Sequence, residues 1–387
     1  MKRYLRQFRE SARKSDWVLL LLCLVCTAFG CLVVASTTNV QGSLQPVITQ
    51  IGATAIGIVF YVIFSAIDAD FFSEHRMGLV AFNTLLLLLL IPLGVTVNGN
   101  RSWIQLPLIP FRIQVAEICK IPFILIMASV MNARQNNISR PRSVFHMVWH
   151  LGVLAGVNLI LSKDMGVSLI FVAIFAGMAF SGGVSLLWFL GIGGLIAVAA
   201  PILYNYFLSE YQQLRIEVLF NPDLDPLGTG PRYHTVQSLR SLTGGGMTGQ
   251  GLFHGHRTQT EGALFAQRTD YIFSAIGEEL GYIGCVIVLV LLFLIVARCI
   301  WVGMRSKDYM RRLICFGAAS ALSFQIISNV GMCIGLTPVI GLTLPFFSYG
   351  GSSIVSLYAM LGLVSGVFAR PKSTSHERYI RPPMNTL

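Results

Sequence analysis

The stretch Tyr271–Ala297 reads YIFSAIGEELGYIGCVIVLVLLFLIVA, and it decides the fold class. Its only charged residues are Glu278 and Glu279, and the run is uncharged from Gly281 to its end. A helix needs about 20 mainly apolar residues to cross the hydrocarbon core of a bilayer, so this stretch predicts a transmembrane helix.

The rest of the chain repeats this pattern. Of its 387 residues, 54% are hydrophobic and 12% charged, against about a quarter charged in an ordinary soluble domain. We therefore predict an all-α polytopic membrane protein with about ten transmembrane helices. The predicted spans are approximately Trp17–Val34, Val47–Ile67, Met77–Val97, Val115–Met131, Val144–Leu161, Met165–Phe180, Val184–Phe207, Tyr271–Ala297, Leu313–Ile334 and Ile354–Phe368.

The formal net charge of +11 comes from short clusters of Lys and Arg between the apolar runs, which favours a membrane topology over nucleic-acid binding. Because such clusters concentrate on the cytoplasmic side, both termini are predicted to be cytoplasmic. The predicted order is a basic leader (1–16), seven helices (17–207), a large extracytoplasmic loop (208–270), three helices (271–368) and a tail (369–387).

Ionisable residues within apolar spans are costly and often functional. Glu117 and Lys120 lie three residues apart, so they share a helix face and can pair. They form either a structural ion pair or the wall of a polar cavity that receives a charged head group. Asp164 follows Lys163 in a tight connection, where it is either an interfacial residue or a functional acid.

Asp270 is placed where the long loop enters the next span, with Glu278 and Glu279 about two turns further along the helix. A carboxyl at such a border is partly desolvated, which raises its basicity and suits a general base. The alternative is a purely structural helix N-cap.

Two other patterns carry less information. The glycine-rich stretch GGGMTGQGLFHG (Gly244–Gly255) could present backbone N–H groups to a phosphate, but it matches no nucleotide fingerprint. The eight cysteines fall in or beside apolar segments, which indicates neither a disulfide framework nor a zinc site.

Taken together, these residues resemble the SEDS family (shape, elongation, division and sporulation), which includes RodA, FtsW and SpoVE. The resemblance extends from the first span to Phe368. The matching stretches are GNRSWI (Gly99–Ile104), the helix of Glu117 and Lys120, DMG (Asp164–Gly166), FNPDLDPLGTG (Phe220–Gly230), Gln237 with Ser238, GGMTGQGL (Gly245–Leu252), TDYIFSAIGEELG (Thr269–Gly281) and NVGMCIGLTPVIGLTLPFFSYGGSS (Asn329–Ser353).

The resemblance implies a peptidoglycan glycosyltransferase in the bacterial cytoplasmic membrane. Such an enzyme polymerises lipid II into glycan strands, inverts the linkage and releases undecaprenyl pyrophosphate, in cell elongation, division or sporulation. The implied partners are a class B penicillin-binding protein, lipid II and membrane lipids. A divalent cation, Mg²⁺ or Mn²⁺, would be bridged by the pyrophosphate of the substrate, since the sequence has no dedicated metal cluster.

Asp270 matches the family's essential aspartate and is the implied general base. The residues expected to bind substrate are Arg101, Glu117, Lys120, Asp164, Arg215, Gln237, Ser238, Gly249, Gly251, Glu278 and Ser348.

The chain departs from the family pattern close to Asp270. Phe265 and Ala266 replace a common Pro-Glu pair, and Arg268 replaces a usual histidine. Two alternatives to a polymerase therefore remain at this point. One is a flippase for the lipid-linked precursor, and the other is a non-catalytic scaffold for a penicillin-binding protein.

Overall fold

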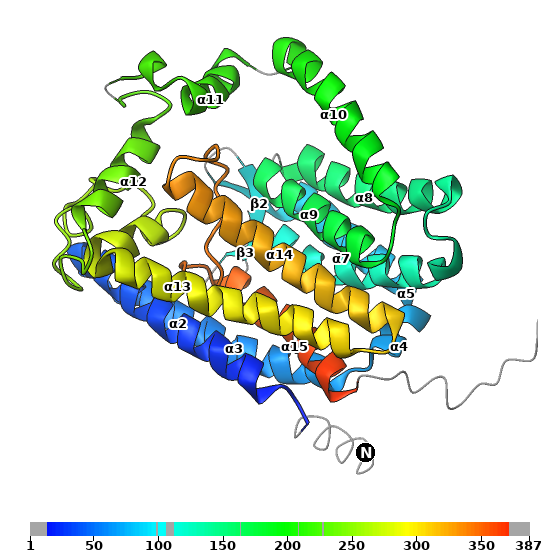
Figure 1. Cartoon of the computed structure of the whole chain (residues 1–387). Coiled ribbons are helices and arrows are strands. Elements are labelled where there is room, and N and C mark those ends of the chain that lie inside the picture. Colours follow the sequence, from blue (N-terminus) through cyan, green and yellow to red (C-terminus); the bar gives the residue numbers. More distant parts are fainter. Residues whose placement is uncertain are drawn as a thin grey trace, which may run out of the picture.

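The computed structural model describes residues 14–97, 100–105, 112–162, 164–207, 209–226 and 228–370, which form a mostly helical protein (Figure 1). The predicted leader lies almost wholly outside these residues, as do Lys163 and most of the predicted tail. The α-helices are α2 (Trp17–Thr38), α3 (Gln45–Ala66), α4 (Ala69–Glu74), α5 (Arg76–Leu88), α6 (Leu90–Leu93), α7 (Val115–Asn132), α8 (Pro141–Ser162), α9 (Met165–Ser181), α10 (Leu186–Phe207), α11 (Glu210–Phe220), α12 (Tyr233–Gly244), α13 (Ile272–Arg305), α14 (Tyr309–Cys333) and α15 (Gly351–Ala369). Three short 3₁₀ helices complete the set, namely η1 (Asn39–Gln41), η2 (Gln135–Asn137) and η3 (Pro222–Leu224).

The predicted membrane architecture is confirmed. Within the described residues, nine helical stretches are long and apolar enough to cross a bilayer. The remaining predicted span is α9, an apolar helix of 17 residues that is slightly shorter than this criterion requires. The protein is therefore a multi-pass membrane protein.

The third predicted span is wrong at its end. Instead of continuing as a helix to Val97, the chain leaves α6 at Leu93 and forms strand β1 (Gly94–Val97). Pro92 cannot continue a helical hydrogen-bond ladder, and the β-branched residues after Gly94 favour an extended backbone. Strands β2 (Asn100–Ile104) and β3 (Ile113–Gln114) complete a small antiparallel sheet in the order β1-β2-β3.

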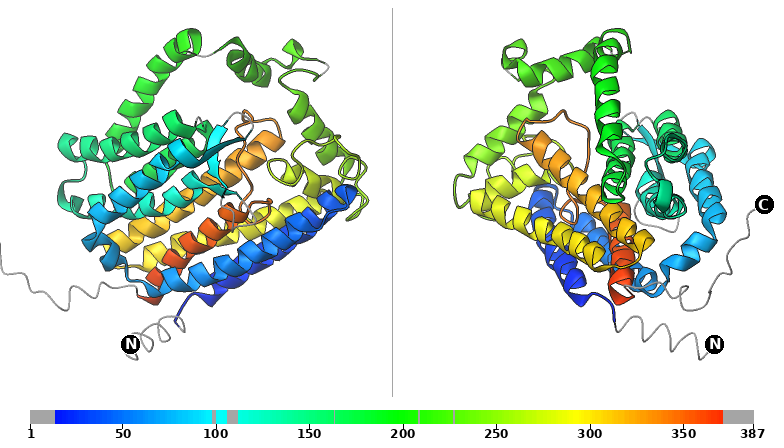
Figure 2. Two further views of the ribbon diagram at one scale, coloured as in Figure 1. Left: turned by 180° about the vertical axis from the view of Figure 1, so that it is seen from behind. Right: turned by 45° about the vertical axis from the view of Figure 1, so that its right-hand side comes forward.

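The centre of the bundle is formed by α7 and α15. In the most apolar stretch of each helix, 89% and 83% of the residues are buried. Helix α3 packs along α15, while α13 lies between α2 and α14 (Figures 1 and 2). Helix α10 is the opposite case, because none of its most apolar stretch is buried, and its C-terminal end projects beyond the bundle towards α11 (Figures 1 and 2). Helices α7 and α15 therefore form the buried core against which the other helices pack.

The stretch predicted as one long loop contains regular structure. Helix α11 follows α10 at the tip of the molecule, and α12 returns towards the bundle (Figure 1). The irregular segment 245–271 then leads into α13.

Helix α13 has a kink at Gly281, whose φ of 68° lies in the left-handed region. A Cβ atom at Gly281 would lie 2.4 Å from the Gly249 nitrogen, so only glycine fits this approach. The N–H groups of Tyr282 and Ile283 donate to the carbonyls of Gly246 and Met247. The kink thus joins α13 to the glycine-rich segment through backbone contacts.

The far end of α13 is held by charged side chains. Arg298 donates to both carboxylate oxygens of Asp16, at 2.8 and 3.0 Å. The buried Arg311 pairs with Asp68 at 2.7 Å and with Asp70 at 3.3 Å. Arg370 donates to the Ser65, Ala66 and Ile67 carbonyls at the end of α3. We call this cluster (Asp16, Asp68, Asp70, Arg298, Arg311 and Arg370) the arginine end, and the opposite end, with the sheet and segments 245–271 and 335–350, the loop end.

Candidate active site

Asp270 lies at the loop end, directly before α13. Its main-chain carbonyl accepts a hydrogen bond of 2.8 Å from the Asn329 side chain in α14. The same Asn329 amide donates to the Leu342 carbonyl at 2.6 Å. Asn329 therefore ties Asp270 to the segment that follows α14.

That segment, residues 335–350, turns back into the bundle before α15 begins, and we call it the re-entrant segment. Leu344, Phe346 and Phe347 are almost completely buried in it. The Ser348 hydroxyl donates to the Thr269 carbonyl at 2.6 Å, and the Tyr349 N–H donates to the Arg268 carbonyl at 2.8 Å. The re-entrant segment thereby fixes the backbone on the N-terminal side of Asp270.

The carboxylate of Asp270 lies close to the re-entrant backbone. A methyl group added at Gly341 would lie 3.6 Å from Asp270 Oδ2, so the glycine leaves room beside the acid. Gly341 has a φ of 71°, which also favours glycine. No ion pair to Asp270 occurs among the described residues.

Burial raises the pKa of Asp270 from 3.8 to about 6, and the negative charge of Asp164 acts in the same direction. A hydrogen bond from Thr269 opposes the increase. A carboxylate with such a pKa is still ionised at neutral pH and is a stronger base than an exposed aspartate. Asp270 lies half-buried directly before α13, the border position at which the sequence predicts partial desolvation.

Asp164 is the second acid of the site. It caps the N-terminus of α9 by accepting from the Val167 N–H at 3.1 Å. It also accepts from the Ser102 hydroxyl in β2 at 3.3 Å and from the Gln114 amide in β3 at 3.2 Å. Burial raises its pKa. The small sheet therefore positions Asp164 within electrostatic reach of Asp270.

The expected pairing of Glu117 with Lys120 is present. The two atoms Nζ and Oε2 are 2.8 Å apart, and the side chains are 4% and 1% exposed. The Ser356 hydroxyl of α15 donates to the same carboxylate oxygen at 3.0 Å. This geometry favours the structural ion pair, because the amine of Lys120 is already engaged in the core.

Other residues predicted to bind substrate form hydrogen bonds within the protein. Ser238 is fully buried, and its hydroxyl donates to the Cys333 carbonyl. Ser348 holds Thr269 as described above and also accepts from the Leu344 N–H. Gln237 accepts a hydrogen bond from Arg257. These contacts hold together the elements that surround Asp270.

The glycine-rich segment requires a correction. The N–H of Gly249 donates to the Gly245 carbonyl, and the N–H groups of Gln250 and Gly251 donate to the carbonyls of Glu278 and Glu279. These amides are engaged inside the fold and are not available to a phosphate. The phosphate contacts expected for Gly249 and Gly251 are therefore not supported.

Glu278 also differs from its expected role. It is fully buried, and its Oε1 accepts from the Arg257 N–H. Glu279 beside it accepts from the hydroxyls of Ser36 and Thr258, both at 2.6 Å. Both carboxylates hold the irregular segment against α2 and α13, which excludes direct contact between Glu278 and a substrate in this conformation.

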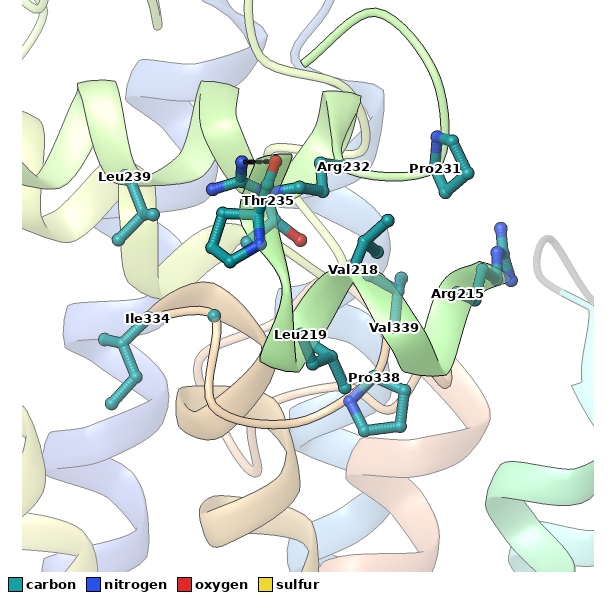
Figure 3. A pocket seen from close by; sticks show the side chains of 12 residues that line it. Arg215, Val218, Leu219, Pro231, Arg232, Thr235, Leu239, Ile334, Pro338 and Val339 are labelled. Atoms are coloured by element: carbon teal, nitrogen blue, oxygen red, sulfur yellow. Dashed lines mark hydrogen bonds between the residues drawn. The ribbon is translucent and has the colours of Figure 1, made fainter. Parts of the chain in front are cut away.

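The remaining basic candidates lie on the surface of the loop end. Arg101 is exposed and donates to the carbonyls of Ile91 and Gly94. Arg215 in α11 lines a pocket of about 130 Å³ between α11, α12 and the start of the re-entrant segment (Figure 3). Asp270 does not line this pocket.

The sequence reasoning missed Asn329, which contacts Asp270, and His234, which lies beside Tyr271. The His234 ring lies 4.7 Å from that of Phe265 and 6.2 Å from that of Tyr271, and its Nδ1 is buried without a partner among the described residues. Burial lowers the pKa of His234, and the charge of Arg215 lowers it further. Asn329 was detectable as a polar residue in an apolar span, but His234 gave no local signal.

Comparison with known proteins finds relatives over nearly the whole chain. The family profile described as "Cell cycle protein" (FTSW_RODA_SPOVE) matches residues 16–372. The chain is 34% identical over 370 residues to "Probable peptidoglycan glycosyltransferase FtsW" of Trichlorobacter lovleyi, covering 92% of this chain and 94% of the relative. It is 30% identical over 362 residues to "Peptidoglycan glycosyltransferase MrdB" of Escherichia coli K12, covering 93% and 95%.

Solved structures share the fold over most of their length. A chain from a structure described as "Structural coordination of polymerization and crosslinking by a peptidoglycan synthase complex" aligns with a TM-score of 0.75 and 26% identity, covering 95% of this chain and 99% of that chain. The rod shape determining protein RodA of Thermus thermophilus aligns with a TM-score of 0.67 and 25% identity, covering 92% and 96%.

Proposed function

The chain belongs to the FtsW, RodA and SpoVE family of cell cycle proteins, and from that premise we propose that it is a peptidoglycan glycosyltransferase that polymerises lipid II with Asp270 as general base. The observation that carries the catalytic assignment is the half-buried carboxylate of Asp270, which lacks an ion pair among the described residues and whose pKa rises to about 6.

In the proposed reaction, Asp270 takes the proton from the 4-hydroxyl of the acceptor's N-acetylglucosamine. The resulting oxygen nucleophile attacks the anomeric carbon of the donor's N-acetylmuramic acid. The bond from that carbon to the phosphate oxygen breaks, and undecaprenyl pyrophosphate leaves with the electron pair. The attack occurs from the face opposite the leaving group, so the linkage inverts.

The leaving pyrophosphate needs positive charge. Arg101 supports this role, because its guanidinium is exposed and anchored by the Ile91 and Gly94 carbonyls. Among the described residues, no group of three or more His, Cys, Asp or Glu side chains could hold a metal ion. A divalent cation would therefore reach the reaction bound to the pyrophosphate.

The proposal places the loop end outside the cell and the arginine end, with both termini, on the cytoplasmic side. The support is the clustering of basic residues at the arginine end, since Arg298, Arg311 and Arg370 lie there together with Arg305 and Arg312. A site on the outer face would meet lipid II after its transfer across the membrane.

We further assign a class B penicillin-binding protein as partner. The support is the likeness to a solved synthase complex that coordinates polymerization and crosslinking, since this chain aligns with 99% of the matched chain in it. A polymerase that works beside a crosslinking enzyme would deliver new strands directly to it.

The decisive experiment is polymerisation of lipid II by the purified protein, with and without the cognate class B penicillin-binding protein. Asp270→Asn is expected to lower the rate by about 100-fold to 10,000-fold, the usual contribution of a general base. The fold should persist, because Asn329 contacts the main-chain carbonyl of Asp270. Asp223→Asn, an exposed acid of the same loop, is the matched control and should retain full activity.

Two results would overturn the proposal. If the native chain forms no strands even with a verified partner, the flippase or scaffold function is the better one. If it forms strands and Asp270→Asn is equally active, the polymerase function stands and Asp270 is not its base.

A further inference from the structure

The pocket between α11 and α12 carries an inference about how the substrate is held. Its floor is apolar and comes from three elements, with Val218 and Leu219 in α11, Leu239 in α12, and Ile334 and Val339 after α14. Arg232 and Arg215 lie on different sides of it (Figure 3). An apolar floor between two guanidinium groups suits a ligand that is apolar along its length and anionic at its end.

The guanidinium of Arg232 is positioned to bind the anionic end of such a ligand. Its Nη1 donates to the Pro222 carbonyl at 2.9 Å and to the Asp225 carbonyl at 3.4 Å, while its Nε and Nη2 have no partner among the described residues. The guanidinium is therefore held in place with donors left over, and little side-chain freedom would be lost on binding an oxyanion.

The nearby acid Asp225 attracts the guanidinium of Arg232 electrostatically, but its carboxylate is bonded to other groups. Its carboxylate accepts from the backbone N–H groups of Thr229, Gly230 and Arg232, at 3.0 to 3.1 Å. These contacts fix the turn that carries Arg232 at the start of α12. Asp225 thus positions Arg232 at the pocket without lining the pocket itself.

The size of the pocket limits its occupant. Pockets that enclose a whole small molecule measure about 300 to 1,000 Å³, whereas this one measures about 130 Å³. It therefore accepts an end group and not a whole sugar unit. The reacting pyrophosphate is a poor candidate, since it must lie at the anomeric carbon near Asp270, which does not line the pocket.

We propose that this pocket binds the terminal carboxylate and last small apolar residue of the peptide carried by the glycan substrate. The proposal rests on the glycosyltransferase function proposed above, because that function brings the peptide of lipid II to the loop end. Bidentate contact with a carboxylate is the geometry that arginine favours.

Binding at the pocket would also affect the backbone beside the catalytic residue Asp270. Pro338 and Val339 line the pocket, and Gly341, two residues further along the same re-entrant segment, lies beside the Asp270 carboxylate. A peptide seated against Val339 would therefore steady the backbone next to the base. Contacts remote from the reacting atoms can in this way contribute to the rate.

The test compares two substrates in polymerisation assays, namely lipid II with its full peptide and a lipid-linked disaccharide without the peptide. Arg232→Gln should raise KM for the peptide-bearing substrate by about 10-fold to 100-fold, the usual effect of losing hydrogen bonds to a charged group, and should leave KM for the peptide-free substrate unchanged. Arg240→Gln, an exposed arginine of α12 that does not line the pocket, is the matched control. Equal effects of Arg232→Gln on both substrates would overturn the proposal and would point to the pyrophosphate as the ligand.

A binding measurement separates this proposal from the function itself. Ligand-observed NMR with the full-length protein in detergent should detect a short peptide ending in D-alanine with a free carboxylate, and should lose the signal for its C-terminal amide or for Arg232→Gln. If the peptide binds and the protein polymerises nothing, the pocket proposal survives while the polymerase function fails. If acid and amide bind alike, the carboxylate proposal is wrong.

Discussion

The two ends of the bundle treat their acidic side chains in opposite ways. At the arginine end, Asp16 contacts Arg298 through both oxygens, and Asp68 and Asp70 share Arg311. At the loop end, Asp164 contacts a hydroxyl, a side-chain amide and a backbone N–H, and no ion pair to it or to Asp270 occurs in the described residues.

This difference indicates that the acids of the arginine end stabilise the fold, whereas those of the loop end are suited to proton transfer. A paired carboxylate stays ionised and is a weak base, because its partner stabilises the negative form. A buried carboxylate without a cation has a raised pKa and can take a proton near neutral pH. The loop end is instead held by hydrogen bonds, such as the backbone contacts between the glycine-rich segment and the kink at Gly281 and the bonds that Glu279 accepts from Ser36 and Thr258. Its structure therefore does not require a cation beside Asp270.

The largest expected effect concerns the arginine end. Arg311→Met should destabilise the protein by about 3 to 5 kcal/mol, because Asp68 and Asp70 would be left without the guanidinium that lies between them. The measurement is the free energy of unfolding in mixed micelles. The lipid II polymerisation rate per folded molecule should stay close to that of the native chain, since Arg311 is far from the loop end.

Arg305→Met is the control for this prediction. Arg305 is exposed at the same end and stacks on Trp301 at 4.3 Å, a contact worth at most about 1 kcal/mol. If both variants lost the same stability, the ion pairs would not be what holds the arginine end.

The second prediction tests whether backbone contacts hold the loop end. Gly249→Ala should destabilise segment 245–270 by about 2 to 3 kcal/mol, because the new Cβ would lie 2.2 Å from the Glu279 carbonyl oxygen and the φ of 82° disfavours alanine. The readouts are the thermal midpoint and the rate of proteolysis within that segment.

Gly262→Ala supplies the matched control. Gly262 also has a positive φ, of 75°, but an added Cβ would meet nothing within 4 Å. It should show only the cost of the backbone conformation, about 1 to 2 kcal/mol. Equal destabilisation by both substitutions would mean that the close approach of Gly249 to α13 contributes nothing.

Hydropathy and charge predicted the membrane fold because they depend on local composition. The apolar runs located the helices, and the position of Asp270 at the start of one of them predicted its desolvation. The sheet of β1 to β3 was missed, since its pairing depends on residues that meet only after folding. The contacts of Ser348 and Glu278 could not be predicted for the same reason, because their partners Thr269 and Arg257 lie 79 and 21 positions away.

The third prediction uses the pKa of about 6 at Asp270. Activity per folded molecule should fall tenfold for each pH unit below 6, because a protonated base cannot accept the proton. A pKa raised on folding also stabilises the protein at low pH, and this contribution is lost as the pH rises through 6. Asp270→Asn should therefore raise the thermal midpoint at pH 8 relative to the native chain, and by less at pH 4.5. A flat pH profile between 5 and 7 would contradict this role for Asp270.

The smallest expected effect tests the coupling between the two unpaired acids. Asp164→Asn removes the negative charge that helps to raise the pKa of Asp270, so the acid limb of the pH profile should move to lower pH by less than about one unit. An asparagine oxygen can still cap α9 and accept from Ser102, so the fold should persist. Asp223→Asn should leave the limb where it is, since that exposed side chain exerts no such influence on Asp270. An unchanged acid limb for Asp164→Asn would show that burial alone sets the basicity of Asp270, and an equal shift for both variants would show that the effect is not specific to Asp164.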